Sequence, residues 1–224
     1  MEQPDESQSE EISEDEDYTD AAVAIGMRGG DSLFGLLIAG AVSIGLAPLI
    51  SSNAADMRYT LSWGVLAIFG ILAWLFGSME RIEQEKPGNI AWGMVFGLIL
   101  AVPILGFGGS NLADGMRLLF PEMPDGTLLT YLVFVMPLAE TLFFRGIFQE
   151  GRSFWVTGIM ATLWQLVLFF QLMNRGPYPL IIGTVLLMAN TMYSYVRGRN
   201  GLAAAWVCQI TLNLVLIFLP LATS

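Results

Sequence analysis

The chain has 224 residues, of which 54% are hydrophobic, and twenty acidic against ten basic residues give it a formal net charge of −10. Soluble domains average about 45–50% apolar residues, so the composition indicates a membrane protein, with membrane lipid as a partner. It argues against nucleic-acid binding, because no basic patch exists. With no histidine and one cysteine, Cys208, we expect no internal disulfide, no metal site built from Cys and His, and no cofactor.

Residues 1–22 form an acidic, low-complexity segment. Ten acidic residues and no basic one lie within residues 1–20, whereas the remaining 204 residues are balanced, with ten acids and ten bases. Such a segment buries too little apolar surface to offset its ordering entropy, which predicts a disordered tail. The alternative is a docking arm for a basic cytoplasmic partner.

Seven apolar runs of about 20 residues follow, each long enough to cross a bilayer core of ~30 Å. The runs are Ser32–Ser51, Thr60–Ser78, Ile90–Gly108, Leu128–Phe148, Phe154–Met173, Pro179–Val196 and Gly201–Leu221. They predict an all-α, polytopic membrane helical bundle of about seven transmembrane helices. We divide it into two N-terminal helices within residues 23–89 and a helical core over residues 90–221. The stretch 116–120, between the third and fourth runs, could be a short interfacial helix.

The basic residues predict the orientation of the bundle in the membrane. One side carries six of them and the other carries three. The six are Arg28, Arg81, Lys86, Arg152, Arg197 and Arg199, and the three are Arg58, Arg117 and Arg175. Because basic residues concentrate on the cytoplasmic side, we expect a cytoplasmic N-terminus. The expected location is a bacterial-type inner membrane or a plasma membrane.

Glu140 and Arg145 lie inside the fourth apolar run, where charges are costly and need a partner or a purpose. Five residues on an α-helix span about 140° of rotation, so the two side chains are not expected to face each other. Arg145 can extend to the cytoplasmic interface. Glu140 lies deeper and needs a donor from another helix, or else is protonated. Pro137 frees a backbone carbonyl nearby, expected to be that of Val133.

Amide side chains in later runs are candidate donors to Glu140. Gln209 and Asn213 are four residues apart and share a helix face at a similar depth. The fifth run offers Gln165 and Gln171, and the sixth offers Asn190 and Thr191. We expect Glu140, Gln209 and Asn213 to approach one another. The plainer interpretation is that each amide only joins neighbouring helices by hydrogen bonds.

The segment Glu140-Thr-Leu-Phe-Phe-Arg145-Gly146 resembles the first motif, EExxxR followed by Gly, of the CAAX-protease and bacteriocin-processing (CPBP) family of membrane proteases. Thr141 stands at the second Glu position. Gln209 and Asn213 resemble the last motif, with Gln in place of His. For the middle motif, FxxxH, Gln171 fits best and Gln165 is a rival. The resemblance covers roughly residues 90–221.

The resemblance implies a helical bundle with a catalytic cavity open to the cytoplasm, in which the first Glu activates water and the histidines assist. Glutamine cannot exchange protons near neutral pH. We therefore expect a non-catalytic relative, with Glu140, Arg145, Gln209 and Asn213 at inactive family-like positions, which binds a membrane-protein partner or serves as a subunit of a membrane complex. The alternatives are an intramembrane endopeptidase in which Glu140 activates water, and a small transporter.

Overall fold

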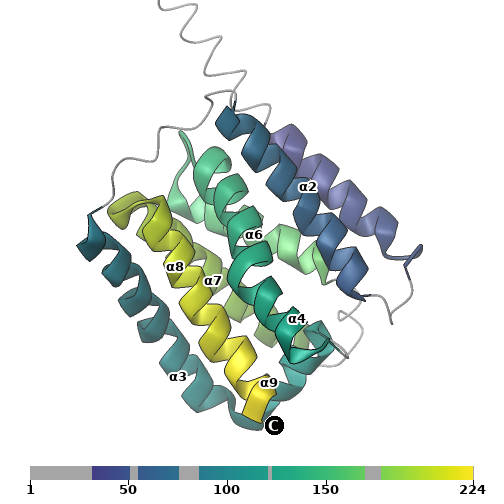
Figure 1. Ribbon diagram of the computed structural model, residues 1–224, viewed down its shortest axis with the longest axis vertical. Helices are drawn as coiled ribbons and strands as arrows, with labels where there is room; N and C mark the ends of the chain where they lie inside the picture. The colour runs from purple at the N-terminus through teal and green to yellow at the C-terminus, as the bar shows by residue number, and fades with distance from the viewer. Residues whose placement is uncertain (1–31, 51–54, 76–85, 121–122, 170–177, 224) are drawn as a thin grey trace, which may run out of the picture.

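A computed structural model describes residues 32–50, 55–75, 86–120, 123–169 and 178–223 (Figure 1). Within these ranges the chain forms helices and no strand, which confirms the predicted all-α bundle. The acidic tail at residues 1–22 lies outside the described residues, as does Gln171.

Each of the seven predicted apolar runs forms a helical unit. The units are Ser32–Leu46, α2 (Ala55–Leu75), α3 (Pro87–Leu119), α4 to η3 (Asp125–Phe148), α6 (Phe154–Leu168), α7 (Tyr178–Asn200) and α8 to α9 (Leu202–Thr223). Five contain a segment long and apolar enough to cross a membrane, whereas Ser32–Leu46 and α6 are shorter. The 15 residues of α6 extend about 22 Å, less than the ~30 Å bilayer core.

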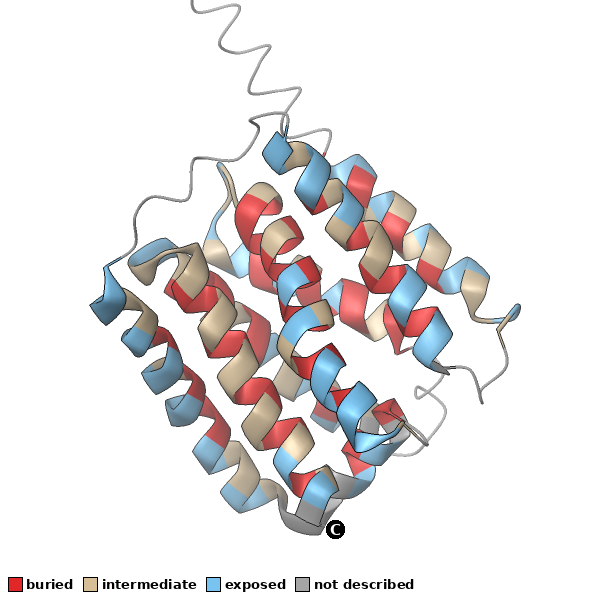
Figure 2. Cartoon of the chain, in the orientation of Figure 1, coloured by how far each residue is buried: buried red, intermediate tan, exposed pale blue. Residues whose placement is uncertain are grey.

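The outer surface of the bundle is apolar, as expected of a protein surrounded by lipid. Buried residues lie on the inward faces of the helices and exposed residues on the outward faces (Figure 2). The exposed residues include large apolar side chains such as Leu37, Phe107 and Leu180, of which Phe107 is 95% exposed. Together with the five membrane-length segments, this surface identifies an integral membrane protein.

The stretch 116–120 is not a separate interfacial helix. Residues up to Leu119 continue α3, and Met116, Leu119 and Phe120 are buried in the core. The hydroxyl of Tyr59, on α2, donates a hydrogen bond to the carbonyl of Leu119. Burial of these apolar side chains and this bond hold the end of α3 against the bundle.

Two glycines let α3 pack directly against α8. A Cβ atom on Gly93 would lie 2.1 Å from the carbonyl oxygen of Ala204, and one on Gly97 would lie 2.9 Å from that of Cys208. The two helices run side by side along one edge of the bundle (Figure 1). Small residues allow this close backbone approach in membrane bundles.

Among the described residues, three segments adopt the wider π-helical register. They are η2 (Tyr131–Val135), η3 (Thr141–Phe148) and η5 (Leu214–Phe218). Segment η2 precedes α5 (Met136–Glu140), and η5 joins α8 (Leu202–Asn213) to α9 (Leu219–Thr223). In this register each N–H bonds the carbonyl five residues earlier. Such segments occur frequently at functional sites.

The π register changes which carbonyl Pro137 leaves free. The N–H of Met136 bonds the carbonyl of Tyr131, so the next residue would bond Leu132. Pro137 has no N–H to donate, and the carbonyl of Leu132 is therefore freed. The expectation for Val133 is wrong because it assumed the α-helical spacing of four residues.

Candidate functional site

The Glu140 carboxylate is the centre of a buried polar cluster. It accepts a hydrogen bond at Oε1 from the indole Nε1 of Trp63, at 2.9 Å. Gln165 Nε2 lies 2.9 Å from both carboxylate oxygens. Gln209 Nε2 donates to Oε2 at 2.7 Å. All four side chains have at most 1% of their surface exposed, so the bundle shields the carboxylate from bulk solvent.

The three donors come from three different helices, and together they occupy the acceptor capacity of the carboxylate. Trp63 lies on α2, Gln165 on α6 and Gln209 on α8. An ionised carboxylate offers about four lone-pair sites, and four donor contacts reach Glu140. The site is therefore a hydrogen-bonded junction of α2, α5, α6 and α8.

Arg145 is enclosed within the bundle. Its side chain is fully buried, so the predicted extension of Arg145 to the membrane interface is wrong. Its Nη2 donates to Asn190 Oδ1 at 2.6 Å, and its Nη1 donates to the backbone carbonyl of Glu140 at 3.4 Å. The guanidinium also lies 5.1 Å from the centre of the Tyr193 ring, within cation–π range.

The π register also explains how Arg145 reaches Glu140. Both residues border or lie in η3, where residues five apart lie about one turn apart. The predicted separation of about 140° is wrong because it assumed α-helical geometry. Among the contacts of the described residues, none joins the guanidinium directly to the Glu140 carboxylate.

Two amides connect the buried cation to the buried carboxylate. Asn190 accepts from Arg145 at Oδ1 and donates from Nδ2 to Gln165 Oε1 at 2.6 Å. Gln165 in turn donates to Glu140. Each amide therefore accepts on the Arg145 side and donates on the Glu140 side. In a medium of low dielectric constant such a chain of bonds is mutually polarised and strengthened.

The remaining predicted site residues lie around this chain of bonds. Thr141 Oγ1 donates to Gln209 Oε1 at 3.4 Å. Asn213 lies one turn beyond Gln209 on α8 and does not bond Glu140. Its Nδ2 donates to the Leu132 carbonyl at 3.0 Å and to the sulfur of Met136 at 3.7 Å. Asn213 thus donates to the Leu132 carbonyl, which has no backbone donor because Pro137 lacks an N–H.

For the middle motif, the residue that meets Glu140 is Gln165. Gln171 lies outside the described residues. The sequence provided no specific signal for Trp63, since a buried indole N–H needs a partner but six tryptophans are present. Asn190 was one of several candidate donors to Glu140. Its bond to Arg145 could not be predicted, because no sequence spacing relates two residues on different helices.

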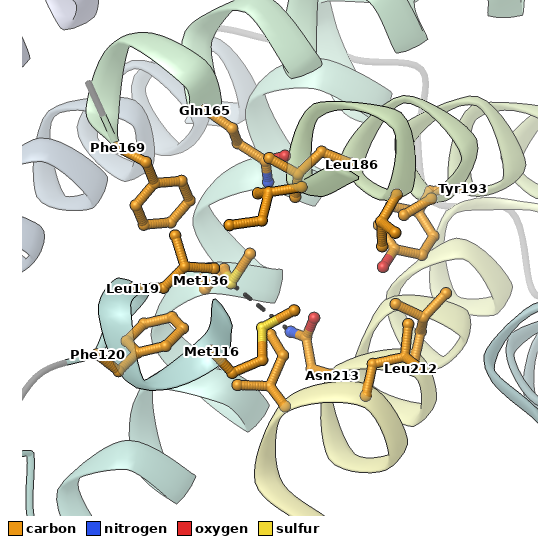
Figure 3. Close-up of a pocket in the computed structure, with 15 residues that line it drawn as sticks. Met116, Leu119, Phe120, Met136, Gln165, Phe169, Leu186, Tyr193, Leu212 and Asn213 are labelled. Atoms are coloured by element: carbon orange, nitrogen blue, oxygen red, sulfur yellow. Dashed lines mark hydrogen bonds between the residues drawn. The ribbon is translucent and has the colours of Figure 1, made fainter. Parts of the chain in front are cut away.

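Beside the polar cluster lies a small, mainly apolar cavity of about 30 Å³ (Figure 3). It is lined by the ends of α3 and α6, the middle of α7, the end of α8 and η5. Its polar lining residues are Gln165, Tyr193 and Asn213, and its apolar ones include Met116, Phe120 and Met136. Glu140 does not line it. Among the described residues, no three cysteine, aspartate or glutamate side chains are grouped so as to hold a metal ion.

Residues 124–215 match the family model described as type II CAAX prenyl endopeptidase Rce1-like. The matched range contains Glu140, Arg145, Gln165, Asn190 and Gln209, and it is narrower than the predicted 90–221. Trp63 lies outside it. No curated protein and no solved structure gives a match to the chain.

Proposed function

From the membership of residues 124–215 in the CPBP family of membrane proteases, we propose that this integral membrane protein is a non-catalytic relative of those enzymes. We propose further that it serves as a partner-binding or structural subunit of a membrane complex. Loss of hydrolysis and the subunit role are separate properties of the protein and can be tested separately.

The occupied state of the Glu140 carboxylate supports the loss of hydrolysis. A general base must hold its water within about 2.6–3.2 Å, through a free lone pair. At Glu140 the contacts of Trp63, Gln165 and Gln209 occupy both oxygens at 2.7–2.9 Å. A water molecule could approach only by displacing one of these buried donors, which would then lack a partner. This single observation carries the proposal.

The chemistry of the donors supports the same conclusion. Gln165 and Gln209 are amides, which donate hydrogen bonds but do not exchange protons near neutral pH. General acid–base assistance is typically worth about 10²–10⁴-fold in rate. The arrangement retains the polar contacts between helices and lacks a group that could transfer a proton to or from a leaving group.

The subunit role extends to parts of the chain outside the matched range. In this proposal the helices within residues 23–89 and the core over residues 90–221 form one scaffold, and α2 contributes Trp63 to the Glu140 cluster. The N-terminus faces the cytoplasm, and the acidic residues 1–20 contact a basic surface of the partner. Ten acidic residues without a base attract such a surface over about one Debye length, ~8 Å at physiological salt.

Native mass spectrometry of the full chain, purified from its own membrane in mild detergent, tests the subunit role. We expect a discrete assembly containing this chain and at least one other membrane protein in fixed ratio. Deletion of residues 2–20 should lower the partner's recovery at low salt more than at high salt, because the tail's contribution is electrostatic. The subunit role would be contradicted if the chain were recovered without any other protein, whether or not lipid is bound to it.

A further inference from the structure

A continuous row of aromatic rings crosses the end of the bundle where α3 and α6 begin and α7 ends. Trp92 and Phe96 lie on α3, Tyr195 on α7, and Phe154 and Trp155 on α6. Each ring contacts the next, with ring centres between 5.0 and 6.1 Å apart. The tryptophans at the two ends of the row are half-exposed. Tryptophan and tyrosine rings in such positions are typical of the level of the lipid headgroups.

Tyr195 is the fixed centre of this aromatic row. Its ring contacts Phe96 at an interplanar angle of 83° and Phe154 at 71°. Edge-to-face pairs of this kind are a preferred arrangement of aromatic rings. Because the two partners come from α3 and α6, they hold the Tyr195 ring in place between those helices.

Arg199 adds an exposed positive charge to the aromatic row. It lies four residues after Tyr195, one turn further along α7, and its guanidinium is 6.0 Å from the centre of the Tyr195 ring, within cation–π range. Arg199 is exposed, and no carboxylate of a described residue is paired with it. The planar fork of a guanidinium matches the oxygens of a phosphate group, so Arg199 can bind one at the headgroup level.

The neighbouring Arg197 has a different role. Both arginines lie in the last turn of α7, where a positive charge complements the helix dipole. Arg197 is half-buried and donates from Nε to the backbone carbonyl of Arg145 at 3.2 Å, so its guanidinium joins α7 to η3. The dipole applies to both residues, whereas only Arg199 combines exposure with the Tyr195 ring.

From the aromatic row toward the membrane interior, α7 presents an exposed apolar stripe. Met188 and Ile181 lie seven and fourteen residues before Tyr195, so the three side chains share one face of the helix. Both Met188 and Ile181 are half-exposed. The stripe from Tyr195 to Ile181 extends about 21 Å, and one leaflet of the hydrocarbon core is about 15 Å deep. An acyl chain can therefore lie along α7 while its headgroup is at Arg199.

We propose that this surface binds one anionic phospholipid, with its phosphate at Arg199 and an acyl chain along the stripe of Tyr195, Met188 and Ile181. The charges of the guanidinium and the headgroup are complementary, and the apolar stripe favours a lipid over a soluble phosphate. Binding here depends neither on the partner-binding role nor on which side of the membrane this end of the bundle faces.

Lipid titration of the full chain, followed by native mass spectrometry in mild detergent, tests this site. The probe is dioleoyl phosphatidylglycerol. Dioleoyl phosphatidylcholine is the zwitterionic comparison with the same acyl chains, and glycerol 3-phosphate carries a phosphate without acyl chains. We expect the first phosphatidylglycerol to bind at least about fivefold more tightly than phosphatidylcholine. Glycerol 3-phosphate at equal concentration should not displace it.

Two variants locate the binding. Arg199→Gln should weaken binding of the first phosphatidylglycerol by about fivefold, the contribution of one basic residue at a membrane surface. It should leave phosphatidylcholine binding unchanged, which also confirms that the variant is folded. Arg117→Gln is the matched control, because it removes the same charge from an exposed position in the last turn of α3, at the other end of that helix. It should bind both lipids as the unchanged chain does.

Three results would overturn the proposal. Equal binding of the two lipids by the unchanged chain would mean that the headgroup charge is not recognised. Equal effects of Arg199→Gln and Arg117→Gln on phosphatidylglycerol binding would mean that the overall charge, and not this surface, determines it. Displacement of the lipid by glycerol 3-phosphate at equal concentration would mean that the apolar stripe contributes nothing.

Discussion

At the scale of single residues, burial of Glu140 is offset by donors from three helices and by Arg145. An isolated carboxylate in an apolar interior is very costly unless it is paired and hydrogen-bonded. Trp63, Gln165 and Gln209 supply the hydrogen bonds, and Arg145 supplies the opposite charge through Asn190 and Gln165. This arrangement makes Glu140 a structural acceptor that holds the helices together.

Two substitutions at Glu140 distinguish loss of charge from loss of hydrogen bonding. Glu140→Gln should cost about 1 kcal/mol, because the Gln209 amide can turn over to accept from the new N–H group while Thr141 bonds its other end. Glu140→Leu should cost about 2–4 kcal/mol, because it leaves buried donors on Trp63, Gln165 and Gln209 unpaired. Thermal unfolding in one detergent measures both. Equal costs would contradict the role of Glu140 as a hydrogen-bond acceptor.

Sequence could predict part of this cluster. Depth along the apolar runs placed Gln209 and Asn213 beside Glu140, and Gln165 was a further candidate donor. Gln209 and Gln165 bond the carboxylate, whereas Asn213 bonds the Leu132 carbonyl instead. The same reasoning could not select Trp63, because α2 is distant in sequence and an indole N–H can bond any nearby acceptor. The buried position of Arg145 was also missed, because it depends on Asn190 and on the ring of Tyr193 from α7.

At the scale of helical elements, the π segments determine which groups face each other. They align Arg145 with the Glu140 carbonyl and leave the Leu132 carbonyl for Asn213. The sequence signal for a break was present in Pro137, but a proline does not reveal whether the surrounding turns are α or π. The sequence therefore pointed to the carbonyl of Val133, one residue away from the carbonyl of Leu132 that Pro137 leaves free.

The bond between Asn213 and Leu132 predicts an energetic coupling with Pro137. Asn213→Leu should destabilise the bundle by about 1–3 kcal/mol, because the Leu132 carbonyl loses its donor. In a Pro137→Ala background the cost should be smaller, because the backbone N–H at 137 can bond that carbonyl in the π register. A double-mutant cycle on unfolding free energies measures the difference. Simple additivity would contradict this account of the π turn.

The contact between α3 and α8 predicts a contrast between two glycines of one helix. Gly93→Ala should destabilise the bundle by about 1–3 kcal/mol, because its Cβ would overlap the Ala204 carbonyl. Gly106→Ala is the matched control, since a Cβ there meets nothing within 4 Å. Alanine should be neutral or stabilising by up to about 1 kcal/mol at that position. Thermal unfolding compares them, and equal effects would argue against the close approach at Gly93.

At the scale of the whole molecule, hydrophobicity predicted the order and type of the seven helical units in the part of the chain that the structure describes. The helix boundaries were predicted less accurately. The third run was expected to end at Gly108, but α3 continues to Leu119, and the fifth was expected to reach Met173, but α6 ends at Leu168. Apolar composition does not reveal where a helix leaves the membrane, so the end of α3 was assigned to a separate segment. The family match over residues 124–215 lies within the predicted core and leaves the N-terminal helices outside it.

The distribution of basic residues predicts the orientation of this bundle. Lys86 precedes α3, and the exposed Arg117 lies in its last turn, so the two positions mark opposite ends of one helix. In a background with Cys208 replaced, Lys86→Cys should resist impermeant maleimide in intact cells and Arg117→Cys should react. Reaction of Lys86→Cys from outside would reverse the topology. Labelling after membrane permeabilisation confirms that both sites are reactive.

The most direct test of the central claim, that Glu140 is a structural acceptor and not a hydrolytic base, is a cleavage assay on the purified full chain. A prenylated CAAX peptide, the substrate type named by the matching family, is incubated with the unchanged chain, with Glu140→Gln and without protein. We predict the same background rate in all three, because the Glu140 lone pairs are occupied and the amides cannot transfer protons. Cleavage by the unchanged chain that disappears in Glu140→Gln would contradict the claim.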